Sequence, residues 1–232
     1  MNLLAFDTST DFLSIAVQGG RAGAVPLEYS GPGGARASSA LIPALQALLA
    51  QAGLRLGDLD AIVFGRGPGS FTGLRTACSV AQGLAFGAAV PVLAVDTLLA
   101  VAEDARQREG VEQVVAVLDA RMDEVYCACY SRHAGQWRQQ GETSLSAPEA
   151  VTVPAGWALA GNAFATYGTR LPAAAVRVEA MPVAAALLRL APALIAAGRA
   201  GSAAAATPLY IRDKVAQTTA ERAAARAASL QP

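Results

Sequence analysis

The residues with the clearest chemical potential are two aspartates, Asp7 and Asp119, each placed where an apolar run gives way to a turn. A carboxylate in such a place can hold a metal ion beside a phosphate or orient an attacking water. It can equally accept hydrogen bonds from the N–H groups of its own turn and do nothing else. The sequence leaves both roles open for Asp7 and favours the turn-stabilising role for Asp119.

A second candidate is the glycine-rich stretch of residues 65–76, GRGPGSFTGLRT, which directly follows the apolar residues 62–64. Closely spaced glycines favour a sharp turn, so we expect a strand-to-helix corner with Ser70 as the helix N-cap. A P-loop needs a lysine directly after its last glycine, and Lys214 is the only lysine of the chain. The glycines also miss the spacing of a dinucleotide-binding turn. We therefore favour a structural corner over a phosphate-binding loop.

Metal and hydrolase chemistry find few supporting residues. Cys127 and Cys129 would share a strand face, but His133 is the only histidine, so a metal site lacks ligands. Residues 69–73, GSFTG, have a superficial likeness to a nucleophile elbow, and His133 lies in a polar stretch far along the chain. We expect buried structural thiols and no independent catalysis.

The composition fits a compact protein of one domain or two small lobes. The chain has 232 residues, of which 53% are hydrophobic, and its 18 basic residues balance its 18 acidic ones. A balanced charge gives no field that would attract nucleic acid unaided. The longest apolar stretch, residues 183–197, contains Arg189 and Pro192 and is too short to span a bilayer. The first residues lack a basic leader, which predicts a reducing cytoplasm.

Two similar hairpins indicate a duplicated architecture. Residues 3–17 and 114–130 each run from an apolar strand through an aspartate turn into a second strand, so Asp7 and Asp119 should face one cleft. Elsewhere the pattern predicts helices over 38–52, 70–86, 97–108 and 184–197, and strands over 61–64, 92–95 and 157–160. A variable loop over 135–146, a return linker over 199–206, a segment 208–215 against the first lobe and a terminal helix over 219–230 complete the expected order.

The first two predicted helices carry unusual apolar faces. Glycine inside a helix costs about 1 kcal/mol relative to alanine, so Gly73 implies that another backbone comes close. We expect these faces to bind a partner's helices, the alternative being the chain's own core. Small residues recur every four positions at Gly73, Ala77, Ala81 and Ala85, and a wide apolar stripe holds Leu41, Ile42, Leu45, Leu48 and Leu49. The predicted partner-interface residues are Leu41, Leu45, Leu48, Ser70, Gly73, Leu74, Ala77, Cys78 and Ala81.

Four stretches together resemble the TsaB family, in its order and over nearly the whole chain. They are LAFDTST at residues 4–10, GPGSFTGLR at 67–75, DARMDEVY at 119–126 and PLYIRDKVA at 208–216. The resemblance implies a cytoplasmic subunit of the bacterial machinery that places a threonylcarbamoyl group on the adenosine beside the anticodon of tRNA. In that family the subunit is a catalytically silent relative of the TsaD transferase, and it binds the transferase through the helices of its first lobe.

The hairpins also resemble those of the actin, Hsp70 and sugar-kinase superfamily, in which two lobes hold ATP between two aspartate turns. The clamp there resembles Asp-x-Gly-[Thr/Ser], whereas residues 7–10 and 119–122 lack glycine. The His-x-x-x-His pair of the transferase relatives is also missing from residues 36–43. Weak nucleotide binding stays open, since residues 161–163 resemble an adenosine-side turn. Its candidate residues are Asp7, Thr8, Ser9, Thr10, Asp119 and Gly161.

We therefore expect an α/β protein with the two-lobed, duplicated actin-like ATPase fold, a mixed sheet and helices in each lobe. Residues 1–97 should form the first lobe, rejoined by residues 208–232, and residues 98–207 the second. Expected partners are a TsaD-type transferase, a TsaE-type ATPase through the complex, a second copy of the chain when it is alone, and tRNA at most indirectly. The chain should need no cofactor or metal, with ATP or ADP left to the complex interface. The alternatives are an autonomous ATPase or phosphotransferase and a homodimeric binding module.

Overall fold

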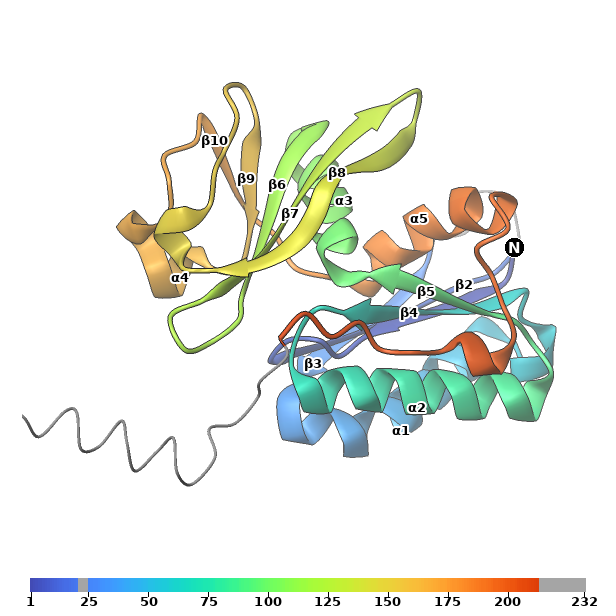
Figure 1. Cartoon of the computed structure of the whole chain (residues 1–232). Helices are drawn as coiled ribbons and strands as arrows, with labels where there is room; N and C mark the ends of the chain where they lie inside the picture. Colours follow the sequence, from blue (N-terminus) through green and yellow to red (C-terminus); the bar gives the residue numbers. More distant parts are fainter. Residues whose placement is uncertain (21–24, 213–232) are drawn as a thin grey trace, which may run out of the picture.

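Two lobes, each built on a five-stranded mixed sheet, make up the protein in a computed structural model that describes residues 1–20 and 25–212 (Figure 1). The first sheet has the order β3-β2-β1-β4-β5 and the second has the order β8-β7-β6-β9-β10. The first sheet comprises β1 (Leu3–Asp7), β2 (Phe12–Gln18), β3 (Leu27–Pro32), β4 (Ala61–Gly67) and β5 (Val92–Asp96). The second comprises β6 (Gln113–Asp119), β7 (Val125–His133), β8 (Gln136–Ser146), β9 (Ala158–Gly161) and β10 (Val176–Glu179).

The two sheets repeat one connectivity, which confirms the predicted duplication. In the first sheet β1 runs antiparallel to β2 and parallel to β4, and in the second β6 runs antiparallel to β7 and parallel to β9. Asp7 ends β1 and pairs with Ser14, while Asp119 ends β6 and pairs with Val125. The two aspartates therefore occupy equivalent corners of the two lobes.

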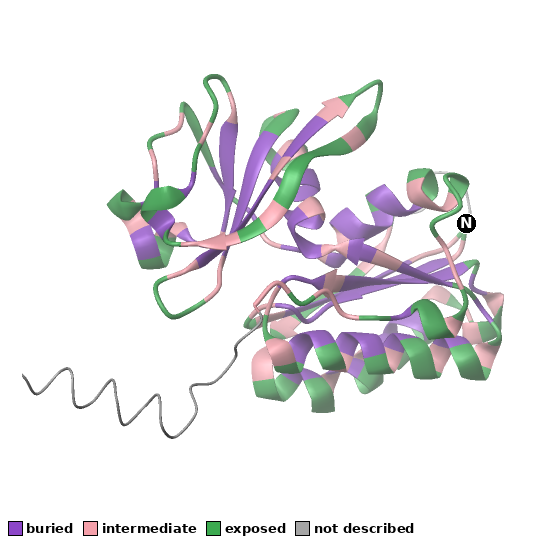
Figure 2. Cartoon of the chain, viewed as in Figure 1, coloured by how far each residue is buried: buried purple, intermediate pink, exposed green. Residues whose placement is uncertain are grey.

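Helices cover both faces of the first sheet, which explains why its central strands are apolar on both sides. Helices α1 (Ala37–Ala52) and α2 (Phe71–Ala88) pack on one face, with Leu4 and Phe6 of β1 in that core. Helix α5 (Ala184–Ala196) packs on the other face, where it meets Leu3 and Ala5. Figure 2 shows the outward sides of α1 and α2 exposed to solvent.

The second lobe is covered mainly by α3 (Thr97–Glu109), whose buried residues join the core of β6 and β7. Opposite them, the short α4 (Phe164–Tyr167) packs with β9 and β6. Because α5 packs on the first sheet, the expected second lobe of residues 98–207 contains one helix that belongs structurally to the first. Short 3-10 turns lie at Gly34–Arg36, Leu56–Asp58, Pro148–Ala150, Gly168–Arg170 and Ala203–Ala205.

Three strands were not predicted from the sequence. The predicted variable loop over 135–146 was wrong, because residues Gln136–Ser146 form β8, a mostly exposed edge strand paired with β7. Strands β3 and β10 are also edge strands with mostly exposed residues. The predicted linker over 199–206 is partly ordered by a bridge between Gly201 and Val92. The predicted helix over 219–230 lies outside the described residues.

Among the described residues, no helix combines the length and apolar character needed to cross a bilayer.

Candidate functional site

The glycine-rich corner is built to hold the first aspartate turn against the start of α2. Thr8 donates from its hydroxyl to the carbonyl of Gly73 at 2.7 Å, and the N–H of Ser70 donates to the carbonyl of Ser9 at 2.7 Å. A Cβ atom at Gly73 would lie 1.8 Å from the carbonyl oxygen of Thr8, and one at Gly69 would lie 2.5 Å from that of Ser9. These glycines are therefore required by contact within the chain, as the structural-corner interpretation predicts. Ser70 is the N-cap residue, although its side chain makes no capping bond.

Asp7 lies beneath this corner and is 1% exposed. Its Oδ1 accepts bonds from the N–H and the hydroxyl of Ser9, at 2.8 and 2.6 Å, whereas Oδ2 has no hydrogen-bond partner among the described residues. Burial raises the pKa of Asp7 from 3.8 to about 6, against the opposing effect of the Ser9 bonds and, more weakly, of the nearby Thr97 hydroxyl. A Cβ atom at Gly65 would lie 1.7 Å from Oδ2, so a glycine there makes room for the carboxylate.

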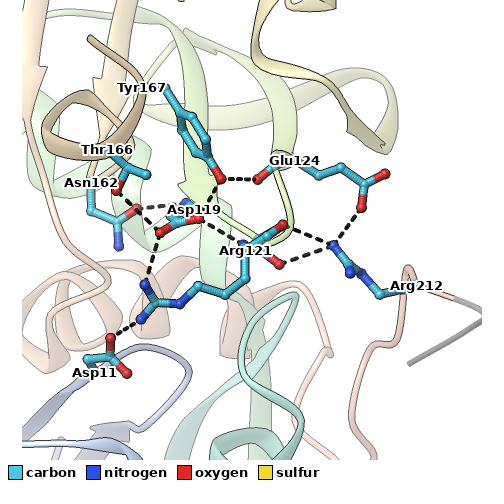
Figure 3. Close-up of polar contacts among 9 residues, drawn as sticks. Asp11, Asp119, Arg121, Glu124, Asn162, Thr166, Tyr167 and Arg212 are labelled. Atoms are coloured by element: carbon cyan, nitrogen blue, oxygen red, sulfur yellow. Dashed lines mark hydrogen bonds and ion pairs between the residues drawn. The ribbon is translucent and has the colours of Figure 1, made fainter. Parts of the chain in front are cut away.

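The second aspartate, Asp119, is held by side chains of its own lobe (Figure 3). Its Oδ1 accepts bonds from the Arg121 N–H at 2.7 Å and the Tyr167 hydroxyl at 3.0 Å, and its own N–H donates to Asn162 Oδ1 at 2.9 Å. Burial of the phenol, followed by its bond to Asp119, raises the pKa of Tyr167 to about 12. The turn-stabilising role expected for Asp119 matches these contacts.

The turn after Asp119 projects toward the first lobe. Arg121, Met122 and Asp123 have φ values of 61°, 56° and 59°, a left-handed conformation that costs free energy for residues other than glycine. The guanidinium of Arg121 contacts both Asp119 and the first-lobe residue Asp11 (Figure 3). The side chain of Arg121 therefore joins two carboxylates at this turn, where a phosphate-binding turn would need accessible backbone N–H groups.

A cavity of about 530 Å³ lies between the lobes. Asp119 lines it but Asp7 does not, so the prediction that both aspartates face one cleft is only half right. Ser9 and Thr10 of the first aspartate turn line the cavity, as do Arg121 and Asn162 of the second lobe. Its remaining walls include Phe12, Phe71, Leu74, Leu118, Tyr126, Met181, Leu209, Tyr210, Ile211 and Arg212.

The other predicted nucleotide-binding residues are committed to internal packing. Thr8 is 0% exposed and bonded to Gly73. Gly161 has φ 151°, and a Cβ atom there would lie 1.7 Å from the carbonyl oxygen of Val117, so it serves the close pairing of β9 with β6. Of the six candidates, Ser9, Thr10 and Asp119 line the cavity, and Ser9 is itself buried.

The predicted partner-interface residues turn out to face inward. The stripe of α2, including Ala77 and Ala81 at 0% exposure, packs against α1 and the first sheet. Side chains buried in the chain's own core have no surface left for a partner, so the small-residue stripe was assigned to the wrong contact. The predicted residues that the structure buries are Leu41, Leu45, Leu48, Gly73, Leu74, Ala77, Cys78 and Ala81, and Ser70 alone is exposed.

The outward side of the same helices is unusual for its lack of charge. Helix α1 contains no acidic or basic residue over its 16 positions, and α2 contains only Arg75 over its 18. The outward side nevertheless exposes Ile42 at 42% and Phe86 at 84%. Surface helices normally carry charges on their solvent side, whereas the one charge here, Arg75, lies over the ring of Phe71 and the other exposed positions of the two helices are uncharged. This charge-free face could have been found in the sequence by counting charges along the two helices.

The spacing of potential metal ligands and the burial of the cysteines bear on metal and thiol chemistry. Within residues 1–20 and 25–212, no three His, Cys, Asp or Glu side chains gather closely enough to hold a metal ion. Burial raises the pKa of Cys78 to about 11 and that of Cys127 to about 12, which keeps both thiols protonated at neutral pH.

Comparison with known proteins agrees with this geometry. The family model described as TsaD, tRNA N6-adenosine threonylcarbamoyltransferase, matches residues 32–225. The tRNA threonylcarbamoyladenosine biosynthesis protein TsaB of Escherichia coli is 34% identical over 93% of this chain and 96% of its own length. The TsaB protein of Haemophilus influenzae is 37% identical over 68% of this chain and 73% of its own length.

Solved structures give the same result for the fold. YeaZ from Pseudomonas aeruginosa superposes with a TM-score of 0.82 at 41% identity, covering 90% of this chain and 99% of that one. A second structure, described as an uncharacterized protein with similarity to peptidase YEAZ from the same organism, gives 0.83 at 41% identity over 91% and 99%. Together with the repeated sheet connectivity, these matches confirm the predicted duplicated actin-like fold.

Proposed function

The chain belongs to the TsaB family of tRNA threonylcarbamoyladenosine biosynthesis proteins, and we propose that it serves there as a non-catalytic subunit that binds and organises a TsaD-type transferase. The observation that carries the proposal is the charge-free face of α1 and α2, defined by the exposed residues Ile42, Gln46, Ser79, Gly83 and Phe86.

Packing physics supports a helical partner for this face. Helices α1 and α2 contact each other and present their outward sides together, so a partner's helix pair could complete a small bundle. Phe86 is a large apolar side chain with most of its surface in water, and burying it would favour association. Glycine at position 83, which lies in the open, would let a partner backbone approach.

The same face could bind a second copy of the chain when the transferase is absent. A face that accepts helices without charge selection does not discriminate a related fold from its own. The homodimer is therefore proposed as a resting state that competes with the heterodimer.

The state of the two aspartate turns supports a silent role. Asp7 is sealed beneath the glycine corner, and the second turn places Arg121 against Asp11 and Asp119. A peptidase would need a nucleophile next to a base, and the single histidine, His133, is exposed on β7. Nucleotide binding, a TsaE-type ATPase and tRNA are accordingly proposed as belonging to the wider complex, in the cytoplasm.

A pair of matched substitutions tests the proposal. Phe86→Asp puts a charge on the charge-free face, and Val176→Asp makes the same kind of change on β10 of the second lobe, where Val176 is 39% exposed. We expect both variants to melt like the wild type. In calorimetric titration with a TsaD-type protein, Phe86→Asp should weaken binding by at least about 100-fold, because an unpaired charge would be buried, and Val176→Asp should not. Wild-type affinity in the Phe86→Asp variant would refute this interface.

A further inference from the structure

The last described residues, 208–212, run from the first lobe to the second beside the cavity. The N–H of Leu209 donates to the carbonyl of Arg66 in β4 at 2.8 Å, which anchors the segment to the glycine corner. A Cβ atom at Gly67 would lie 2.6 Å from the carbonyl oxygen of Leu209, so the corner leaves a groove for this backbone. Gly67 has φ 120°, a conformation that also requires glycine.

Tyr210 fixes the segment to the start of α2. Its ring lies 5.2 Å from the ring of Phe71, measured between centroids, and its hydroxyl accepts a bond from Arg75 Nε at 3.2 Å. The Arg75 guanidinium also lies 3.7 Å above the Phe71 ring, a cation–π distance. The one charged residue of α1 and α2 is therefore engaged with this segment.

Two residues further on, the segment holds the second lobe. Ile211 packs against the core of β6 and β7, and Arg212 donates to the carboxylate of Glu124 at 2.6 Å and the carbonyl of Ala120 at 3.0 Å (Figure 3). The side chain of Arg212 is 13% exposed and that of Glu124 37%, so the pair is shielded from water mainly on the arginine side. By contrast, the Arg121–Asp11 pair, which also joins the two lobes at this turn, is exposed at both ends.

We propose that residues 208–212 form a strap that fixes the second-lobe turn, residues 119–124, to the start of α2 along one wall of the cavity. The strap contributes Leu209, Tyr210, Ile211 and Arg212 to the cavity wall. Because Tyr210 touches the first lobe and Arg212 the second, loosening either end frees the turn. This device operates in the chain alone and does not depend on the partner proposed above.

Hydrogen exchange of the full chain, read by mass spectrometry, tests the strap. The amides of Ala120 and Glu124 are bonded within the turn, at 2.9 and 3.1 Å, so the folded turn is protected from exchange. Arg212→Ala should speed exchange over residues 119–125 by at least about tenfold. The matched control is Arg177→Ala, since Arg177 also donates to carbonyls, those of Leu171 and Pro172, but lies away from the strap.

The decisive variant is Tyr210→Ala, which removes contacts with the first lobe only. The strap predicts faster exchange in the second-lobe turn, at least about fivefold, while Tyr210→Phe, which keeps the ring stack, should give a smaller effect. If Tyr210→Ala leaves the turn unchanged and Arg212→Ala does not, Arg212 is a local cap and the strap is refuted. Wild-type exchange in both variants, or equal acceleration in Arg177→Ala, would refute it as well.

Discussion

Asp7 lies in the first aspartate turn of the actin-like fold, and its carboxylate is enclosed by the chain. Ser9 satisfies one carboxylate oxygen, and the other faces Gly65 without a hydrogen-bond partner among the described residues. A buried carboxylate with one oxygen unsatisfied favours its neutral form, which is why its pKa rises to about 6. The residue is better suited to filling the corner than to binding a cation.

The raised pKa gives a stability prediction with a definite sign. Because the folded-state pKa lies above the unfolded value of 3.8, the contribution of Asp7 to stability is fully present below about pH 3.8 and is lost as the pH rises through about 6. Asp7→Asn should therefore be more stable than the wild type at pH 8, by up to roughly 3 kcal/mol, and should lose this advantage near pH 4. Thermal melts across that range measure the difference. Glu28→Gln, at an exposed position of β3, is the control, and a pH-independent difference for Asp7→Asn would contradict the assignment.

At the scale of elements, α2 illustrates what a sequence pattern omits. The repeat of small residues correctly indicated a close contact, but periodicity does not identify the second surface, and here it is the first turn and the sheet. The opposite side of the helix exposes Phe86 and has no charge beyond Arg75. This lack of charge could have been recognised in the sequence as unusual for a solvent-facing surface. Helix α2 therefore has an internal face, formed by the small residues and packed in the core, and an exposed outward face that includes Phe86.

Two glycines of α2 test this division directly. Gly73→Ala would place a Cβ atom 1.8 Å from the Thr8 carbonyl, whereas Gly83 has no atom within 4 Å of such a Cβ. We expect Gly73→Ala to lower the free energy of unfolding by about 2 kcal/mol or more, because backbone must move. Gly83→Ala should raise it by up to about 1 kcal/mol through helix propensity. Denaturant titration measures both, and equal effects would show that Gly73 is not held against the turn.

Hairpins and buried helices were predictable because burial enforces their periodicity. The central strands β1, β4 and β6 and helix α3 begin and end within a few residues of their expected bounds. The edge strand β8 was missed because its sequence, QWRQQGETSLS, is mostly polar, with only Trp137 and Leu145 packed against the core, so it depends largely on pairing with β7. The contacts of Tyr210 and Arg212 could not be predicted either, since they join residues that are far apart in the sequence.

At the scale of the whole molecule, the protein keeps the duplicated actin-like fold. At each aspartate turn, however, the aspartate is bonded to a neighbouring residue of the chain itself. We expect the purified chain to hydrolyse ATP no faster than an Asp7→Ala, Asp119→Ala double variant. The physical reason is that neither turn offers open backbone to phosphates, with Arg121 against Asp119 and Ser9 against Asp7. A coupled phosphate-release assay measures the rate. Turnover clearly above that of the double variant would reinstate the ATPase alternative.

The most direct test of the central claim is reconstitution of threonylcarbamoyl transfer with a TsaD-type protein and the remaining components, with variants of this chain added in turn. If the chain acts through its charge-free face, Asp119→Asn should support modified adenosine at the wild-type rate, while Phe86→Asp should reduce the rate to that without the chain. An inactive Asp119→Asn variant that still binds the transferase, or a fully active Phe86→Asp variant, would contradict the account.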